Sequence, residues 1–246
     1  MASLIEIAET HWFRFLSRWA LFGGLTFLGG FILFAVLAPS GQASSLPPEY
    51  QNLALAMAQP TLYRFGMTFD MLNWLALAGL FLALAGVFAR QAPIRCALLA
   101  VCGGGQLIGF LSGVLGFEGN TDLAAHYAAA APDQQAVLLR SFLDLQYVVN
   151  ACSTAGGWLW GLALVLVAWM AWSQDEFPRW LTGLVALNGT ISAFSIVYGI
   201  ITGGAALFVV ELLRLVLLMI IFFCVAAAFW RRVPAPAPDM QPAPAH

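Results

Sequence analysis

Six long apolar stretches constrain this chain more than any other feature of its sequence. They run at about residues 19–38, 66–88, 97–117, 146–172, 180–200 and 205–230. Each is about as long as, or longer than, the ~20 residues with which an α-helix crosses a hydrocarbon core of ~30 Å. Barrel strands are shorter and alternate in polarity, which these stretches do not. The sequence therefore predicts an all-α fold, a polytopic membrane bundle of six transmembrane helices in a lipid bilayer. The composition agrees, because 61% of the residues are hydrophobic and only 9% are charged.

Arginine alone sets the predicted orientation, because the chain contains no lysine. On one side of the spans lie Arg14, Arg18, Arg90, Arg95, Arg179, Arg231 and Arg232, and on the other lie Arg64 and Arg140. Cytoplasmic segments carry the positive excess, so we expect both termini to be cytoplasmic. The missing lysine also excludes a retinal-type Schiff base and a phosphate-binding loop.

The chain divides into three predicted parts. Residues 1–18 form an amphipathic segment that we expect to lie flat at the inner interface, with a simple extension of the first span as the alternative. Residues 19–232 form the transmembrane domain, and residues 233–246 form a disordered tail of alternating proline and alanine. Two long outer loops with short helices are expected. In the first, Pro47-Pro48-Glu49 opens a helical stretch, and in the second, Pro132-Asp133 begins a pattern that runs straight into the fourth span.

Glycine spacing predicts where helices touch. Gly105, Gly109 and Gly113 recur at every fourth residue of the third span, and Gly157 and Gly161 continue the same spacing from Ser153 in the fourth. Small residues let helix backbones approach closely in a membrane. The facing helix can belong to the same chain or to a second copy, and the sequence leaves both open.

Polar residues within the spans are concentrated in the half predicted to face outward. They are Asp70, Asn73, Asn150, Ser153, Thr154, Ser192, Ser195, Tyr198, Glu211 and Arg214. An ionisable group in hydrocarbon costs at least ~2.5–3.5 kcal/mol, so a one-sided cluster predicts a polar cup open to the outer face. The sharpest hypothesis is a network of Asp70, Glu211 and Arg214. The alternatives are an ion pair that fastens helices and, for the two serines of the fifth span, hydrogen bonds to neighbouring helices.

Metal and cofactor signals are weak. Glu118, Asp122 and His126 recur at intervals of four, but Gly119 and Asn120 indicate a break in the helix there, so we expect no metal site. The histidines all lie outside the spans, where they cannot hold a haem within the membrane, and no cofactor is expected. No nucleophile motif is present either, so we expect no catalytic residues.

Three short motifs resemble a known family. They are Tyr63-Arg64 with Asp70-Met71-Leu72, the glycines Gly156, Gly157 and Gly161, and Phe177-Pro178-Arg179-Trp180-Leu181-Thr182-Gly183. Together they are similar to an uncharacterised family of bacterial six-helix membrane proteins, a domain of unknown function (four-three-eight-six). The resemblance covers about residues 19–230 and implies six helices and a bacterial plasma (inner) membrane location. It implies no activity and no catalytic residue.

Three functions remain compatible with the sequence. The favoured one is a non-catalytic partner subunit or sensor whose outer cup receives a ligand or a membrane protein partner. A small oligomeric carrier or channel for an ion or anionic solute is the first alternative, although the inner halves of the spans offer almost no polar lining. An intramembrane lipid-acting enzyme, with Asp70 or Glu211 as acid or base, is the second. No nucleic-acid partner is expected.

Overall fold

The computed structural model describes residues 4–42, 46–89, 91–202 and 208–233, and these form helices without a strand. The helices are α1 (Leu4–Gln42), η1 (Pro48–Tyr50), α2 (Gln51–Ala58), α3 (Pro60–Phe88), α4 (Pro93–Ala129), α5 (Pro132–Gln174), α6 (Arg179–Thr202) and α7 (Phe208–Trp230). Five stretches of the described residues are long and apolar enough to cross a membrane. They are Thr10–Leu33, Pro60–Phe88, Pro93–Ala129, Pro132–Gln174 and Leu212–Trp230. The predicted all-helical class is thus confirmed, and the length and composition of the helices are those of a multi-pass membrane protein.

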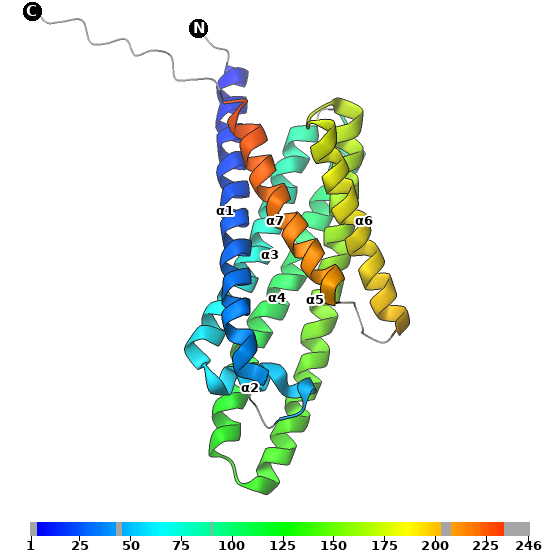
Figure 1. Cartoon of the computed structure of the whole chain (residues 1–246). Coiled ribbons are helices and arrows are strands. Elements are labelled where there is room, and N and C mark those ends of the chain that lie inside the picture. Colours follow the sequence, from blue (N-terminus) through cyan, green and yellow to red (C-terminus); the bar gives the residue numbers. More distant parts are fainter. Residues whose placement is uncertain (1–3, 43–45, 90, 203–207, 234–246) are drawn as a thin grey trace, which may run out of the picture.

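The six long helices form a closed ring (Figure 1). Helix α1 packs on α3, α3 on α4, α4 on α5, α5 on α6 and α6 on α7, and α7 returns to pack on α1. Long helices that follow one another in the chain are therefore neighbours and run antiparallel (Figure 1). Helix α2 contacts α1, α3 and α4 and covers one end of the ring.

The opposite end of the ring, where α1 begins and α7 ends, is filled by aromatic and aliphatic side chains. The Phe177 ring lies edge-on to those of Phe88 and Phe229, with centroid distances of 6.4 and 5.7 Å. The Ser17 hydroxyl fastens α1 to α7 by donating to the carbonyl oxygen of Ala226 at 2.8 Å. The chain segments toward this end also carry Arg14, Arg18, Arg95, Arg179, Arg231 and Arg232. We call it the aromatic end.

Helix α1 differs from the prediction for residues 1–18. It runs without a break from Leu4 to Gln42, so residues 4–18 continue the axis of the first span. The reason is packing inside the ring, because the Phe13 ring stacks on Phe229 at 5.6 Å and Leu16 is fully buried. The structure thus has the helix extension that the sequence offered as the alternative. Of the predicted tail, residues 234–246 lie outside the described residues.

The second predicted outer loop is almost entirely helical, and α5 runs without a break from Pro132 into the fourth span, as the pattern after Pro132-Asp133 predicts. Helix α4 has 37 residues and α5 has 43, and only Ala130 and Ala131 separate them. At 1.5 Å per residue both are longer than ~50 Å, so the α4–α5 hairpin extends well beyond a core of ~30 Å. It projects past α2 at the lower end of Figure 1. The predicted short helices do occur in the first connection, between α1 and α3, as η1 and α2.

Gly119 and Asn120 do not interrupt α4, which corrects the expected break. Gly119 faces α5 so closely that a Cβ there would overlap the Leu145 side chain. The Asn120 amide group, which is 1% exposed, donates to the Tyr63 hydroxyl at 2.6 Å. Two residues with weak helix propensity are thus retained in a helix because tertiary contacts outweigh that propensity.

Candidate functional site

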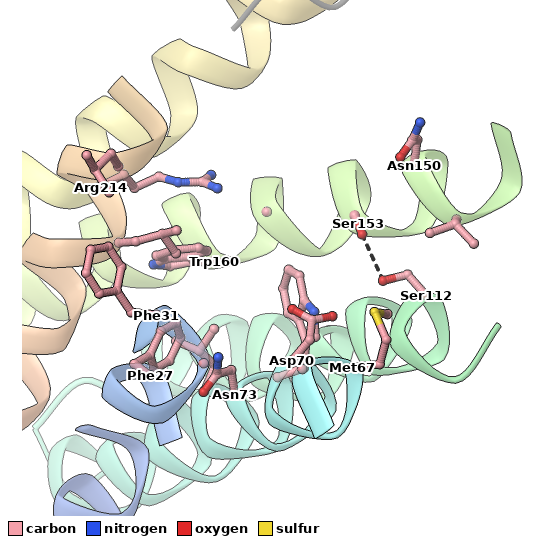
Figure 2. A pocket seen from close by; sticks show the side chains of 18 of the residues that line it. Phe27, Phe31, Met67, Asp70, Asn73, Ser112, Asn150, Ser153, Trp160 and Arg214 are labelled. Carbon is pink, nitrogen blue, oxygen red and sulfur yellow. Dashed lines mark hydrogen bonds between the residues drawn. The ribbon is translucent and has the colours of Figure 1, made fainter. Parts of the chain in front are cut away.

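A cavity of about 620 Å³ lies inside the ring, between the aromatic end and helix α2. Its walls come from α1, α2, α3, α4, α5 and α7 (Figure 2). The lining is mainly apolar, with Phe27, Phe31, Leu77, Leu215 and Met219 among the contributing side chains. A volume of this size is in the range of small-molecule binding sites.

Five residues of the predicted cup line this cavity together. Asp70 and Asn73 come from α3, Asn150 comes from α5, and Arg214 comes from α7. Ser153, on the same face of α5 as Asn150, also lines the cavity, and its hydroxyl hydrogen-bonds to that of Ser112 on α4 at 2.8 Å. The structure thus brings polar side chains from four helices to one space.

The serines of α6 have a different environment. Ser192 and Ser195 are buried, and the Ser192 hydroxyl donates to Asn188 Oδ1 at 3.1 Å. Asn188 Nδ2 in turn donates to the Arg214 carbonyl oxygen on α7 at 3.1 Å. Asn188 thus fastens α6 to α7, whereas the Ser192 and Ser195 hydroxyls bond within α6 itself. The side chains of Tyr198 and Glu211 lie outside the described residues.

Asp70 and Asn73 present hydrogen-bond acceptors from α3. The Asp70 carboxyl group is hydrogen-bonded to the side chain of Trp74, whose indole can only donate. Its Oδ2 lies 3.3 Å from the point where a Cβ on Gly113 would stand. The Asn73 Oδ1 atom is buried and has no hydrogen-bond partner in the described part of the chain.

Arg214 and Trp160 present donors on the opposite side of the cavity. The Arg214 guanidinium group lies over the Trp160 ring, 4.4 Å from its centroid. Trp160 is 3% exposed, and within the described residues its Nε1 donor has no hydrogen-bond partner. Figure 2 shows the Arg214 side chain reaching from α7 along Trp160, with Asp70 and Asn73 across the cavity. Asp70 and Arg214, two members of the predicted network, therefore line the same cavity from different walls.

A chain of hydrogen bonds near α2, which sequence reasoning missed, holds this end of the bundle together. Asn52 Nδ2 donates to Gln146 Oε1 at 3.2 Å, and Gln146 Nε2 donates to Asn120 Oδ1 at 2.9 Å. Asn120 then donates to Tyr63, so the chain links α2, α5, α4 and α3. Asn52, Tyr63 and Gln146 also line the cavity.

The cavity-facing side of α5 could have been found from spacing. Gln146, Asn150, Ser153, Gly157 and Trp160 follow one another at intervals of four, three, four and three, and all five line the cavity. Such intervals place side chains on one face of a helix. Trp160 escaped notice because a tryptophan in a span is usually assigned to the core or the interface.

The predicted packing glycines lie at helix contacts and at the cavity wall. A Cβ on Gly109 would overlap the Trp74 ring, and one on Gly156 would lie 2.9 Å from the same ring. The Trp74 side chain therefore fits between α4 and α5 because both positions are glycine. A Cβ on Gly161 would lie 3.0 Å from the backbone nitrogen of Ala193, where α5 meets α6. The other three face Leu159 (Gly105), Met71 (Gly113) and the cavity (Gly157).

The residues considered for a metal lie on the projecting hairpin. Glu118, Asp122 and His126 share the continuous helix α4, and His126 Nδ1 lies 2.8 Å from the Asp122 carbonyl oxygen. All three side chains are exposed. Across the residues that the structure describes, no group of three His, Cys, Asp or Glu side chains is placed to hold a metal ion.

The fold and the cavity define the class of this protein, a multi-pass helical membrane protein with an internal site that is partly polar. The family model described as "Domain of unknown function (DUF4386)" matches residues 22–230, and the chain belongs to that family. The resemblance noted from the sequence motifs is thereby confirmed. Neither a curated protein nor a solved structure matches the chain.

Proposed function

We propose that this protein is a non-catalytic sensor or partner subunit of the bacterial plasma membrane, which binds a ligand in the cavity from the outer side. The observation that carries the proposal is the position of Asp70, Asn73, Asn150 and Arg214 around one cavity. Ionisable and amide groups in a membrane are costly, so their convergence indicates a function. The largely apolar lining gives the ligand a place to bury an apolar part.

In the proposed arrangement α6 also crosses the membrane, as the fifth of six spans, and both termini are cytoplasmic. Helix α6 has 24 residues, enough for ~36 Å, and it packs between α5 and α7. Six described arginines at the aromatic end support a cytoplasmic position for that end. The cavity and the α4–α5 hairpin then face outward.

Cysteine labelling tests this orientation. His126→Cys on the hairpin is expected to react with a membrane-impermeant maleimide in intact spheroplasts. Gln91→Cys, in the exposed turn between α3 and α4, is expected to react only after permeabilisation. The wild-type chain with its four free cysteines serves as the blank. The reverse pattern of labelling would contradict the proposed orientation.

The closed aromatic end supports binding over transport. Beyond the cavity, fully buried side chains such as Phe81, Leu164 and Phe222 fill the ring. A carrier or channel needs a polar path to the other side, and the residues of this cluster offer none. Within the described residues, no group of three His, Cys, Asp or Glu side chains could supply a metal ion for the enzyme alternative.

Co-purification tests ligand binding. The wild-type protein, purified from its native membrane, is expected to carry a bound small molecule detectable by native mass spectrometry. Val149→Trp fills the cavity and should remove it, whereas Val148→Trp, at a neighbouring position that is 50% exposed, should leave it bound. Equal occupancy in the two variants, or no bound molecule in the wild type, would contradict the proposed function.

A further inference from the structure

The cavity has an acceptor side on α3. Asp70 and Asn73 are three residues apart and therefore share one face of the helix. The Asn73 oxygen is buried without a hydrogen-bond partner among the described residues, and an amide oxygen can only accept. The Asp70 carboxyl group, which already accepts from Trp74, adds a second acceptor of negative charge when ionised. This side of the cavity suits a ligand group that donates hydrogen bonds and carries positive charge.

The donor side comes from α5 and α7. The Trp160 indole N–H is buried without an acceptor among the described residues, and an indole can only donate. The Arg214 guanidinium group lies over the same ring and carries a permanent positive charge. An anionic ligand group placed here would satisfy the Trp160 donor and meet the positive charge of Arg214.

The two sides face one cavity, which selects against simpler ligands. A plain anion would satisfy the donors but leave the Asn73 acceptor unpaired, and it would repel the Asp70 carboxylate. A plain cation would leave the Trp160 donor unpaired and would face Arg214. A buried polar group that stays unpaired weakens binding. The apolar lining, which includes Phe27, Phe31 and Leu215, requires an apolar body as well.

We infer that the cavity binds a zwitterion with an apolar body, with its ammonium group at Asp70 and Asn73 and its carboxylate or phosphate group at Arg214 and Trp160. This inference rests on the proposed ligand-binding function and names the chemistry of its ligand. Two sources supply that chemistry: the phosphoethanolamine headgroup of a phospholipid and a free apolar amino acid.

Two matched probe series separate these sources. The amino-acid series is L-phenylalanine, N-acetyl-phenylalanine without the ammonium charge, and phenylalanine amide without the carboxylate. The lipid series is hexanoyl-lysophosphatidylethanolamine, its choline analogue without N–H donors, and hexanoyl-lysophosphatidate without the ammonium group. Binding to the full chain in nanodiscs is measured by calorimetry. In at least one series, we expect the complete zwitterion with N–H donors to bind at least tenfold tighter than both of its analogues.

Variants assign each ligand group to its side of the cavity. For the amino-acid series, Asp70→Asn and Asn73→Leu should weaken phenylalanine and its amide about tenfold without affecting the N-acetyl compound. Arg214→Gln should weaken phenylalanine and the N-acetyl compound without affecting the amide. In the lipid series both analogues keep the phosphate and differ at the ammonium end. Arg214→Gln should therefore weaken all three lipids, whereas Asp70→Asn and Asn73→Leu should weaken the lysophosphatidylethanolamine without affecting the lysophosphatidate. Asp144→Asn and Arg140→Gln, at exposed positions of α5, are the matched controls and should leave every affinity unchanged.

The outcomes separate this inference from the proposed function. If the analogues bind as tightly as the complete zwitterions with N–H donors, or if none of the six probes binds, the inference is wrong. The proposed function then still stands if the wild-type protein co-purifies with a molecule that Val149→Trp excludes. If nothing co-purifies and no probe binds, both are wrong. A variant that fails to accumulate is replaced in the comparison by Asn73→Asp, which keeps an acceptor and should retain phenylalanine binding.

Discussion

The contact between Gly109 and Trp74 allows a sharp test of the packing around the cavity. In Gly109→Ala the new methyl group would overlap atoms at the rigid fused edge of the Trp74 indole. The ring has little room to yield toward α5, because a Cβ on Gly156 would lie only 2.9 Å from it. Either α3 and α4 separate or the Trp74 side chain leaves its position.

The expected loss of stability is about 1–3 kcal/mol, which is the usual cost of overpacking a close contact. Gly104→Ala provides the matched control five residues earlier on α4, where a Cβ would have no heavy atom within 4 Å. In a helix this change should be neutral or stabilise by up to ~1 kcal/mol, because alanine has the higher helix propensity. The two variants should therefore differ by about 1–4 kcal/mol.

Reversible unfolding in mixed micelles, titrated with sodium dodecyl sulfate, measures the free energy of unfolding of both variants. A double-mutant cycle adds Trp74→Leu, whose smaller side chain leaves room for the methyl group. The Gly109→Ala change should then cost less in the Trp74→Leu background than in the wild type, by more than ~0.5 kcal/mol. Equal stabilities for Gly109→Ala and Gly104→Ala, or a cycle with no coupling, would refute the packing argument.

Two further predictions concern hydrogen bonds that fasten helices. Tyr63→Phe removes the hydroxyl that accepts a hydrogen bond from Asn120, so it should lower the free energy of unfolding by about 1–2 kcal/mol in the same titration. The control is Tyr147→Phe, at a side chain that is 75% exposed, which should change this free energy by less than ~0.5 kcal/mol. Asn188→Leu removes the donor to a backbone carbonyl of α7 and should lower the free energy of unfolding by about 1–2 kcal/mol, whereas Thr190→Ala, at an exposed position, should hardly change it. An effect at Asn188 no larger than that at Thr190 would contradict the proposed fastening of α6 to α7.

The sequence by itself determined the class of fold, because the length and apolarity of a span follow from the thickness of a bilayer. It also selected Asp70, Asn73, Asn150 and Arg214, since polar groups stand out against an apolar background. Local rules failed where distant contacts opposed them. Gly119 and Asn120 predicted a break, yet α4 continues because Asn120 bonds to α3 and α5.

Only the tertiary structure decided which polar residues share a space. Ser192 carries the same kind of sequence signal as Ser153, but the first is buried between helices and the second lines the cavity. The rotation of each helix about its axis makes this difference, and it depends on how side chains and glycines pack across helices, as with Trp74 against Gly109. Trp160 gained its place beside Arg214 in the same way. Periodicity within one helix defines a face, whereas the partner of that face is fixed by the closing of the whole ring.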